Sequence, residues 1–160
     1  MADFGELPLK YRLPLLAYPW RRIDPVPWAK LRRPLRDARI ALVTSAGLFR
    51  PGIDRDFGTR EGDGRSARFL PADVDLASLA IGQTSDAIDR AAIERDRNLA
   101  LPLDRLRDLH TAGEVGDIAP RHPSFNGSLI APGRFMRDTA PLVAEALAKD
   151  AVDAVLFVPV

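Results

Sequence analysis

The chain has 160 residues, a net charge of +1 and no cysteine. Its length suits one domain with an ordinary core, and an apolar share of 46% beside a charged share of 28% is typical of a folded globular protein. The near-neutral charge gives no electrostatic reason to expect nucleic acid as a partner, no apolar run is long enough to cross a membrane, and disulfides and thiol nucleophiles are excluded within these residues.

Two further features of the sequence indicate the setting of the protein. Of the 23 basic residues only Lys10, Lys30 and Lys149 are lysine, a preference that is common in GC-rich bacterial genomes. The N-terminus is acidic and soon broken by proline, which does not fit a secretory signal, so we expect a cytoplasmic protein.

Residues 1–37 form a proline-rich arm. Its prolines argue against a long regular element, whereas its leucines, tyrosine and tryptophans are too apolar for a solvated tail. We therefore expect the arm to pack on the following domain, residues 38–160, or on a partner subunit. The basic residues between Arg21 and Arg39 come without a nucleic-acid motif and are interpreted as a solvated or packing face.

Residues 38–160 alternate between the patterns of strands and helices. Strands are predicted at 39–44, 67–70 and 79–81, and helices at 87–97, 102–110 and 132–149, with loops at 50–65 and 114–131. Strand, helix and strand joined by short links favour a parallel sheet. The fold class predicted is α/β, an open, mostly parallel sheet with flanking helices in a flavodoxin- or Rossmann-like three-layer arrangement.

Signals at the helix boundaries support these assignments. Ser85 and Asp86 are suited to cap the first helix, and Pro102 suits the first turn of the second, which should end near Gly113. In the third helix, Pro141 predicts either a kink or a restart capped by Thr139. The apolar face of that helix is predicted to comprise Met136, Ala140, Val143 and Leu147.

The last ten residues, 151–160, predict a strand. Their nearly continuous apolar run is typical of a strand covered on both faces of a parallel sheet. Such strands normally lead into a loop at their carboxyl end, where open α/β sheets bind ligands. We therefore expect the fold to be incomplete at Val160, with an unpaired edge that invites aggregation.

Three places in the sequence could carry chemistry. Thr44–Gly47 leaves the first strand and is either a plain turn or a ligand-binding loop, although it lacks the lysine of a P-loop and the glycine spacing of a dinucleotide site. Asp96 and Asn98 stand near Asp104 and Arg105. These residues either form ion pairs that fix a loop, the favoured interpretation, or orient a substrate.

His122 and Ser124 form the third place. His110 and His122 are the only histidines, so any imidazole base must be one of them. A serine hydrolase built from Ser45 or Ser124 with His122 is conceivable, but no Gly-x-Ser-x-Gly motif supports it. From the residues alone, an exposed, non-catalytic His122 is favoured and a metal site is not expected.

An ordered set of segments resembles the selenoprotein B family of the glycine, sarcosine, betaine and D-proline reductases, of which the chain looks like a divergent member. The order and approximate spacing agree from about Arg33 to the end of the chain. The matching segments are Ala41–Leu48, Glu94–Asn98, Leu101–Leu106, Gly116–Pro120 with His122 and Ser124–Phe125, and Val152–Val155.

The resemblance implies that the catalytic nucleophile lies beyond the residues given. In the family, the strand that corresponds to Val152–Val160 is followed at once by a redox motif of selenocysteine or cysteine, two residues and a further cysteine. We therefore expect a selenocysteine or cysteine redox pair directly after Val160. We also expect that the reading frame was closed at a UGA codon and that the chain alone is inactive. The alternative is an ordinary stop or a degenerate paralogue.

The resemblance also implies the chemistry and the partners. Family members cleave a C–N bond of a small amine or amino-acid-like substrate reductively, are re-reduced by a thioredoxin-like partner, and work with other reductase subunits, including a pyruvoyl-bearing one. The expected cleft residues are Thr44, Ser45, Asn98, His122 and Ser124, with Asp96, Asp104 and Arg105 as orienting residues. The alternative function is a non-enzymatic subunit that binds a small ligand or serves in assembly.

Overall fold

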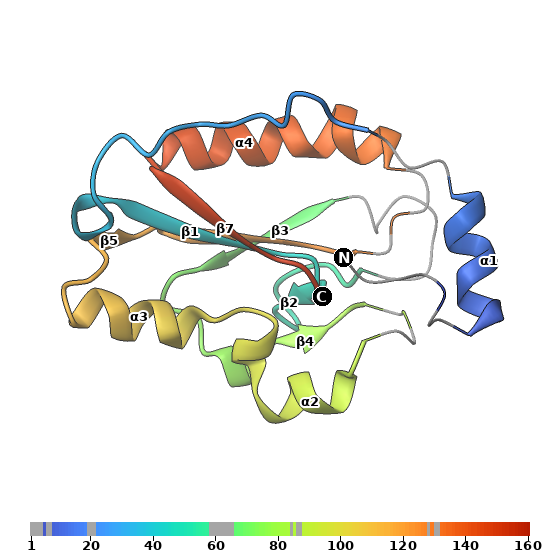
Figure 1. The fold of residues 1–160 in the computed structure, drawn as a ribbon. Helices are drawn as coiled ribbons and strands as arrows, with labels where there is room; N and C mark the ends of the chain where they lie inside the picture. Colours follow the sequence, from blue (N-terminus) through green and yellow to red (C-terminus); the bar gives the residue numbers. More distant parts are fainter. Residues whose placement is uncertain are drawn as a thin grey trace. The chain divides into compact units, whose positions relative to one another are not determined.

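A computed structural model describes residues 5, 8–18, 22–57, 66–83, 85, 88–127, 129 and 132–160. The chain divides into two compact units, Met1–Lys30 and Leu31–Val160. The first unit contains helix α1 (Leu9–Ala17), which the proline pattern did not predict (Figure 1). Pro14 lies inside this helix, where it removes one backbone donor from a short run of good helix formers. What the arm packs against stays a prediction.

The second unit is built on one sheet. In it β1 (Arg39–Thr44) runs parallel to β5 (Asp117–Ile118), β6 (Arg121–Phe125) and β7 (Ala154–Val158), while β3 (Ala67–Pro71) runs antiparallel to β6. β5 and β6 follow one another along one side of β1, and β7 pairs with its other side from Ile40↔Ala154 to Thr44↔Val158. The predicted strands at 39–44 and 67–70 and the mostly parallel sheet are confirmed.

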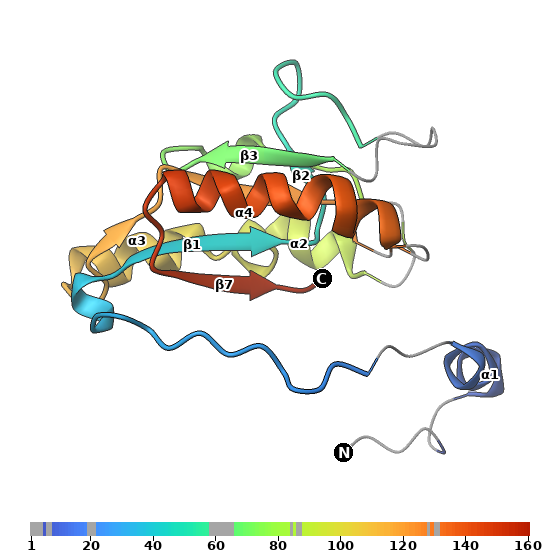
Figure 2. The same ribbon diagram turned by 90° about the horizontal axis from the view of Figure 1, so that it is seen from above.

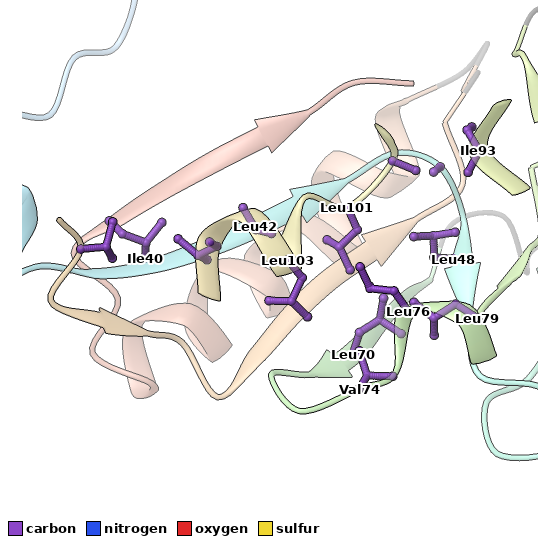
Figure 3. Close-up of a cluster of buried hydrophobic side chains, with 14 of the residues drawn as sticks. Ile40, Leu42, Leu48, Leu70, Val74, Leu76, Leu79, Ile93, Leu101 and Leu103 are labelled. Atoms are coloured by element: carbon purple, nitrogen blue, oxygen red, sulfur yellow. The ribbon is translucent and has the colours of Figure 1, made fainter. Parts of the chain in front are cut away.

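Helices cover both faces of the sheet. Figure 1 shows α4 (Ala140–Lys149) on one face and α2 (Arg90–Arg95) with α3 (Leu103–Thr111) on the other. β1 is buried from Ile40 to Thr44 because its alternate side chains contact both layers. The main core lies on the α2 and α3 side, where Leu42 packs with Leu101 and Leu103 (Figure 3). The predicted three-layer arrangement is confirmed.

The helix boundaries follow local capping chemistry. α2 begins at Arg90, capped by Asp89, whose side chain accepts a hydrogen bond from the backbone N–H of Ala92. The helix is therefore shorter than predicted, and Asp86 of the predicted cap lies outside the described residues. α3 follows Pro102 as predicted, and Gly113 stands just beyond its end with a φ of 74°.

The third predicted helix consists of two parts. A π-helical turn, Phe135–Thr139, precedes α4, and Pro141 lies in the first turn of α4, where a missing N–H is tolerated. The side chain of Thr139 forms no capping hydrogen bond. Of the predicted apolar face, Ala140, Val143 and Leu147 are half-buried, whereas Met136 is exposed.

The predicted loop at 114–131 is wrong because it contains β5 and β6. Pro120 and Pro123 gave this segment the pattern of a loop. β6 nevertheless lies between β1 and β3, and toward β1 it has a single register pair, Thr44↔Ser124. A strand that shares so few ladder bonds with one neighbour tolerates proline.

Among residues 1–160, β7 is an edge strand, so the prediction that these residues bury it on both faces is wrong. Leu156 is 53% exposed and Phe157 is 69% exposed. Neighbouring strand residues point to opposite faces, and so both faces are uncovered here. In Figure 2 α4 lies across the sheet between β1 and β3 and leaves β7 uncovered.

The remaining strands are short. β2 (Leu48–Phe49) pairs antiparallel with β4 (Ala80–Ile81), which confirms the weak strand predicted at 79–81. The predicted loop at 50–65 begins with a turn held by the ion pair of Arg50 and Asp54 at 2.7 Å, and residues 58–65 lie outside the described part. No helix in the described part of the chain has the length and hydropathy needed to cross a bilayer.

Candidate functional site at the carboxyl edge of the sheet

Three parallel strands end together at one edge of the sheet. Thr44, the last residue of β1, pairs with Ser124 of β6 on one side and with Val158 of β7 on the other. The loops that follow such strand ends commonly form the ligand sites of open α/β sheets. The structure therefore brings Thr44, Ser45 and Ser124 to one place.

The turn after β1 is tightly hydrogen-bonded. The Thr44 hydroxyl accepts a hydrogen bond from the N–H of Ala46 at 3.1 Å. Gly47 adopts a φ of 64°, donates to the carbonyl of Phe125 at 2.9 Å and accepts from the N–H of Gly82 at 2.8 Å. A side chain at position 47 would be strained and would approach the backbone N of Gln83 to 3.1 Å.

Ser45 is bonded to the end of the chain. Its hydroxyl accepts a hydrogen bond from the N–H of Val160 at 2.9 Å and donates to the carbonyl of Val160 at 3.2 Å. The backbone N–H of Ser45 donates to the carbonyl of Val158 at 3.2 Å. The side chain thus holds the backbone that follows β7.

His122 is fully buried, so the sequence-based preference for an exposed histidine is wrong. The residue lies on β6, and its Nδ1 accepts a hydrogen bond from the backbone N–H of Leu42 at 3.0 Å. This bond leaves the ring proton of the neutral imidazole on Nε2. Burial, and secondarily the positive charge of Arg107, lowers the pKa of His122 to about 4. The ring is therefore neutral at pH 7.

Buried polar atoms without a partner lie at alternate positions along β6 and just beyond its end. Among the described residues, His122 Nε2, Ser124 Oγ and Asn126 Oδ1 form no hydrogen bond. Buried polar groups are nearly always paired, so a row of such atoms along one strand is a mark of a functional site or of bound water. The sequence analysis did not single out Asn126. The signal available for it was that a polar residue directly follows the apolar Phe125, which ends β6.

The hydrolase interpretation receives no support from this geometry. His122 Nε2 and Ser124 Oγ have no hydrogen bond to each other or to another described group, and the Ser45 hydroxyl is bonded to Val160. A serine nucleophile needs a base within hydrogen-bond reach, and none is paired with either serine here.

Asn98 belongs to a second cluster, at the start of α3. Its side-chain oxygen accepts from the N–H of Asp104 at 3.1 Å, and its amide donates to the carboxylates of Asp104 at 3.0 Å and Asp96 at 3.1 Å. The backbone and side-chain donors of Asn98 lower the pKa of Asp96. These bonds fix the entry into α3, which agrees with the favoured, loop-fixing interpretation.

A cleft of about 250 Å³ lies over this second cluster. Its polar lining includes Asp75, Glu94, Asp96, Asn98, Asp104 and Arg107. Arg105 is not part of the cleft lining; it forms an exposed ion pair with Asp108 at 3.5 Å. Within the described ranges, no group of three His, Asp or Glu side chains is arranged as metal ligands.

Arg107 fixes α3 to the segment that follows β3 and was not predicted from the sequence. It donates to Asp104 at 2.7 Å and to the carbonyls of Ala72 at 2.7 Å and Val74 at 2.8 Å. Its charge also contributes to the lowered pKa of His122. In the sequence, its spacing of three residues from Asp104 was the available signal.

The fold and the site define an open-sheet α/β protein whose polar residues collect at the carboxyl ends of parallel strands. The family model described as glycine/sarcosine/betaine reductase selenoprotein B matches residues 16–159. The chain belongs to this family, which confirms the resemblance seen in the sequence.

Two curated relatives agree with this assignment. The chain is 31% identical over 136 residues to the D-proline reductase subunit gamma of Acetoanaerobium sticklandii, covering 84% of this chain and 54% of the relative. It is 30% identical over 144 residues to the sarcosine reductase complex component B subunit beta of Peptoclostridium acidaminophilum, covering 88% of this chain and 32% of the relative. The chain thus spans about half and about a third of their lengths. No solved structure matches the chain.

Proposed function

We propose that the chain acts as the selenoprotein B-type subunit of a reductase complex that cleaves the C–N bond of a small amine or amino-acid-like substrate. Family membership over residues 16–159 supports the reaction class, and the relatives' names, D-proline reductase and sarcosine reductase, support the substrate class. The proposed partners are the other subunits of the complex and a thioredoxin-like reductant in the cytoplasm.

The observation that carries this proposal is the position of Val160. The Ser45 hydroxyl holds both polar groups of the Val160 backbone at the carboxyl edge of the sheet. The residue that follows Val160 would therefore start at the edge where ligands bind in open α/β sheets. We place a selenocysteine or cysteine redox pair there. Such a group supplies the nucleophile and the two electrons that the reductive cleavage of a C–N bond consumes.

The residues of this chain would supply the polar surroundings of that chemistry. His122 is neutral at pH 7 and presents Nε2–H as a donor, since its Nδ1 is bonded to Leu42. Ser124 adds a hydroxyl on the neighbouring position of the same strand face. In this proposal Thr44 and Ser124 contribute hydroxyl groups at the edge, and His122, which lies on β6 before the edge, contributes a hydrogen-bond donor behind them. Asn98, Asp96 and Asp104 orient α3.

The proposal is tested with the complete protein. The DNA after the Val160 codon should continue into a selenocysteine or cysteine codon, and the protein is produced with cysteine at that position. Combined with its partner subunits and a thioredoxin-type reductant, it is assayed for release of ammonia or an amine from glycine, sarcosine and betaine, and for opening of the D-proline ring to an open-chain amino acid. The matched control replaces that first cysteine by serine, which should abolish activity. A reading frame without the redox pair, or full activity of the serine variant, would contradict the proposal.

A non-enzymatic assembly role is the second candidate, and the exposure of Leu156 and Phe157 on β7 favours it. Uncovered apolar side chains on an edge strand suit a surface that another polypeptide covers. In the same experiment, a subunit required for complex formation but indifferent to the serine replacement would support this role instead.

A further inference from the structure

Every polar group of Ser45 is used to join strand ends. Its N–H and hydroxyl bond to Val158 and Val160 after β7. Its carbonyl accepts a hydrogen bond from the N–H of Gly127, beyond the end of β6, at 2.8 Å. Ser45 therefore ties the segments that follow β6 and β7 to the end of β1.

The bonds to Val160 replace ladder bonds that the backbone cannot form. The register of β1 with β7 ends at Thr44↔Val158, and Pro159 has no N–H to donate. Beyond that pair β1 turns away through Ala46 and Gly47. The Ser45 side chain extends the connection to Val160, which also packs against the main hydrophobic core.

The surroundings of Ser45 leave little space for another arrangement. A Cβ on Gly127 would lie 3.0 Å from the Ser45 carbonyl oxygen and 3.1 Å from the Ser45 Cβ. Glycine at this position lets the segment after β6 approach Ser45 closely. The serine is thus held from the side of β6 while it holds Val160.

We propose that Ser45 is a positioning residue, which fixes Val160 so that the next residue of the chain leaves the sheet edge in one direction. The inference assigns Ser45 to the backbone rather than to substrate, in contrast to the sequence-based expectation of a cleft residue. Its chemical importance rests on the proposed function, which puts the reacting selenol or thiol next to Val160. Reactions that depend on such alignment are sensitive to displacements of about 1 Å.

The positioning itself is tested without any catalytic activity. Because the chain has no cysteine, a single cysteine appended after Val160 can carry a nitroxide spin label at one site. With Ser45 present, the spectrum should be that of a label on an ordered backbone. Ser45→Ala should shorten the rotational correlation time of the label several-fold, toward that of a free chain terminus. Circular dichroism and urea unfolding check that each variant is folded.

Two further variants define the comparison. Ser78→Ala removes an exposed hydroxyl that bonds to the carbonyl of Asp75 at 2.6 Å, and it should leave the label unchanged. Gly127→Ala keeps the hydroxyl but crowds Ser45, and it should loosen the label to an intermediate degree. A label that is freely mobile with Ser45 present, or equally ordered in Ser45→Ala, would overturn the inference.

The complete complex gives the second measurement. Ser45→Ala should lower kcat on the order of 100-fold with KM within about twofold, because alignment and not substrate binding is lost. A raised KM with unchanged kcat would mean that Ser45 binds substrate, which overturns the inference. If the wild-type complex has no reductase activity, the proposed function fails, whereas the label measurement still decides the positioning role.

Discussion

The imidazole of His122 accepts the backbone N–H of Leu42 at 3.0 Å, so a side chain of β6 supplies a bond that sheet partners usually form through their backbones. The bond requires an unprotonated Nδ1. A protonated ring would present N–H to N–H at this point, close to the charge of Arg107. The junction of β1 and β6 therefore depends on the protonation state of one residue.

The first prediction is that acid destabilises the protein through His122. Its pKa falls from 6.5 to about 4 on folding, so the unfolded chain binds more protons between these values. The contribution of the neutral His122 to the free energy of unfolding is fully present above pH 6.5 and is lost as the pH falls toward 4. The contribution is about 3 kcal/mol, from 1.36 kcal/mol for each pH unit.

Urea unfolding between pH 4 and 8 measures this effect, with His122→Gln as the comparison. Ion-paired carboxylates such as Asp117, whose pKa is lowered by Arg39, also lose stability in acid, but they do so equally in both proteins. The difference between wild type and variant should therefore shrink toward acid. Parallel curves would show that His122 does not carry the dependence.

The sequence predicted the part of the fold that local patterns determine. The apolar run at 39–44 and the boundary residues Pro102 and Gly113 led to the correct elements because burial and capping act within a few residues. The strand at 121–125 was missed because Pro120 and Pro123 give this segment the pattern of a loop, and the segment is a strand only through its pairing with β1 and β3. The exposure of β7 could not be read from its own residues. Whether a strand is covered depends on where the helices pack, and α4 packs over the sheet between β1 and β3 (Figure 2).

The candidate site was predictable to a similar extent. The strand pattern alone indicated that Thr44 ends a strand and Ser45 follows it, at the edge where ligands bind. The burial of His122 and the link from Arg107 to Asp104 are tertiary facts, for which short-range spacing gives no signal. Asn98 was singled out correctly as part of a polar cluster, but its bonds to Asp104 place it at a helix start and not among the strand ends.

The second prediction separates structural from functional roles for Asn98. Asn98→Ala removes the acceptor for the Asp104 N–H and should lower the free energy of unfolding by about 1 to 2 kcal/mol, as loss of a helix cap does. KM of the complete complex should stay within about twofold, because the side chain is used inside the protein. Arg105→Ala, at an exposed ion pair, should cost under about 0.5 kcal/mol. A large rise in KM for Asn98→Ala would place substrate in the cleft over α3.

The third prediction concerns two glycines with opposite surroundings. A Cβ on Gly116 would lie 2.6 Å from the backbone carbon of Asp37 and 2.8 Å from the backbone N of Ala38, which cannot move without displacing the start of β1. Gly116→Ala should therefore destabilise by about 3 kcal/mol or more. Gly133→Ala meets no atom within 4 Å and should be neutral or stabilise by up to about 1 kcal/mol. Thermal unfolding compares the two, and equal effects would contradict the packing around Gly116.

The last prediction uses two residues that face each other across β1 and β7. Val43 pairs with Phe157 and points to the same face, yet Val43 is 3% exposed and Phe157 is 69% exposed. Val43→Thr buries a hydroxyl and should cost about 1 to 3 kcal/mol. Phe157→Thr keeps strand propensity and should cost under about 1 kcal/mol in the 160-residue chain. It should also reduce self-association in analytical ultracentrifugation, because it removes apolar surface from an unpaired edge. If Phe157→Thr costs as much as Val43→Thr at concentrations where the chain is monomeric, then β7 is covered in solution and its description as an exposed edge is wrong.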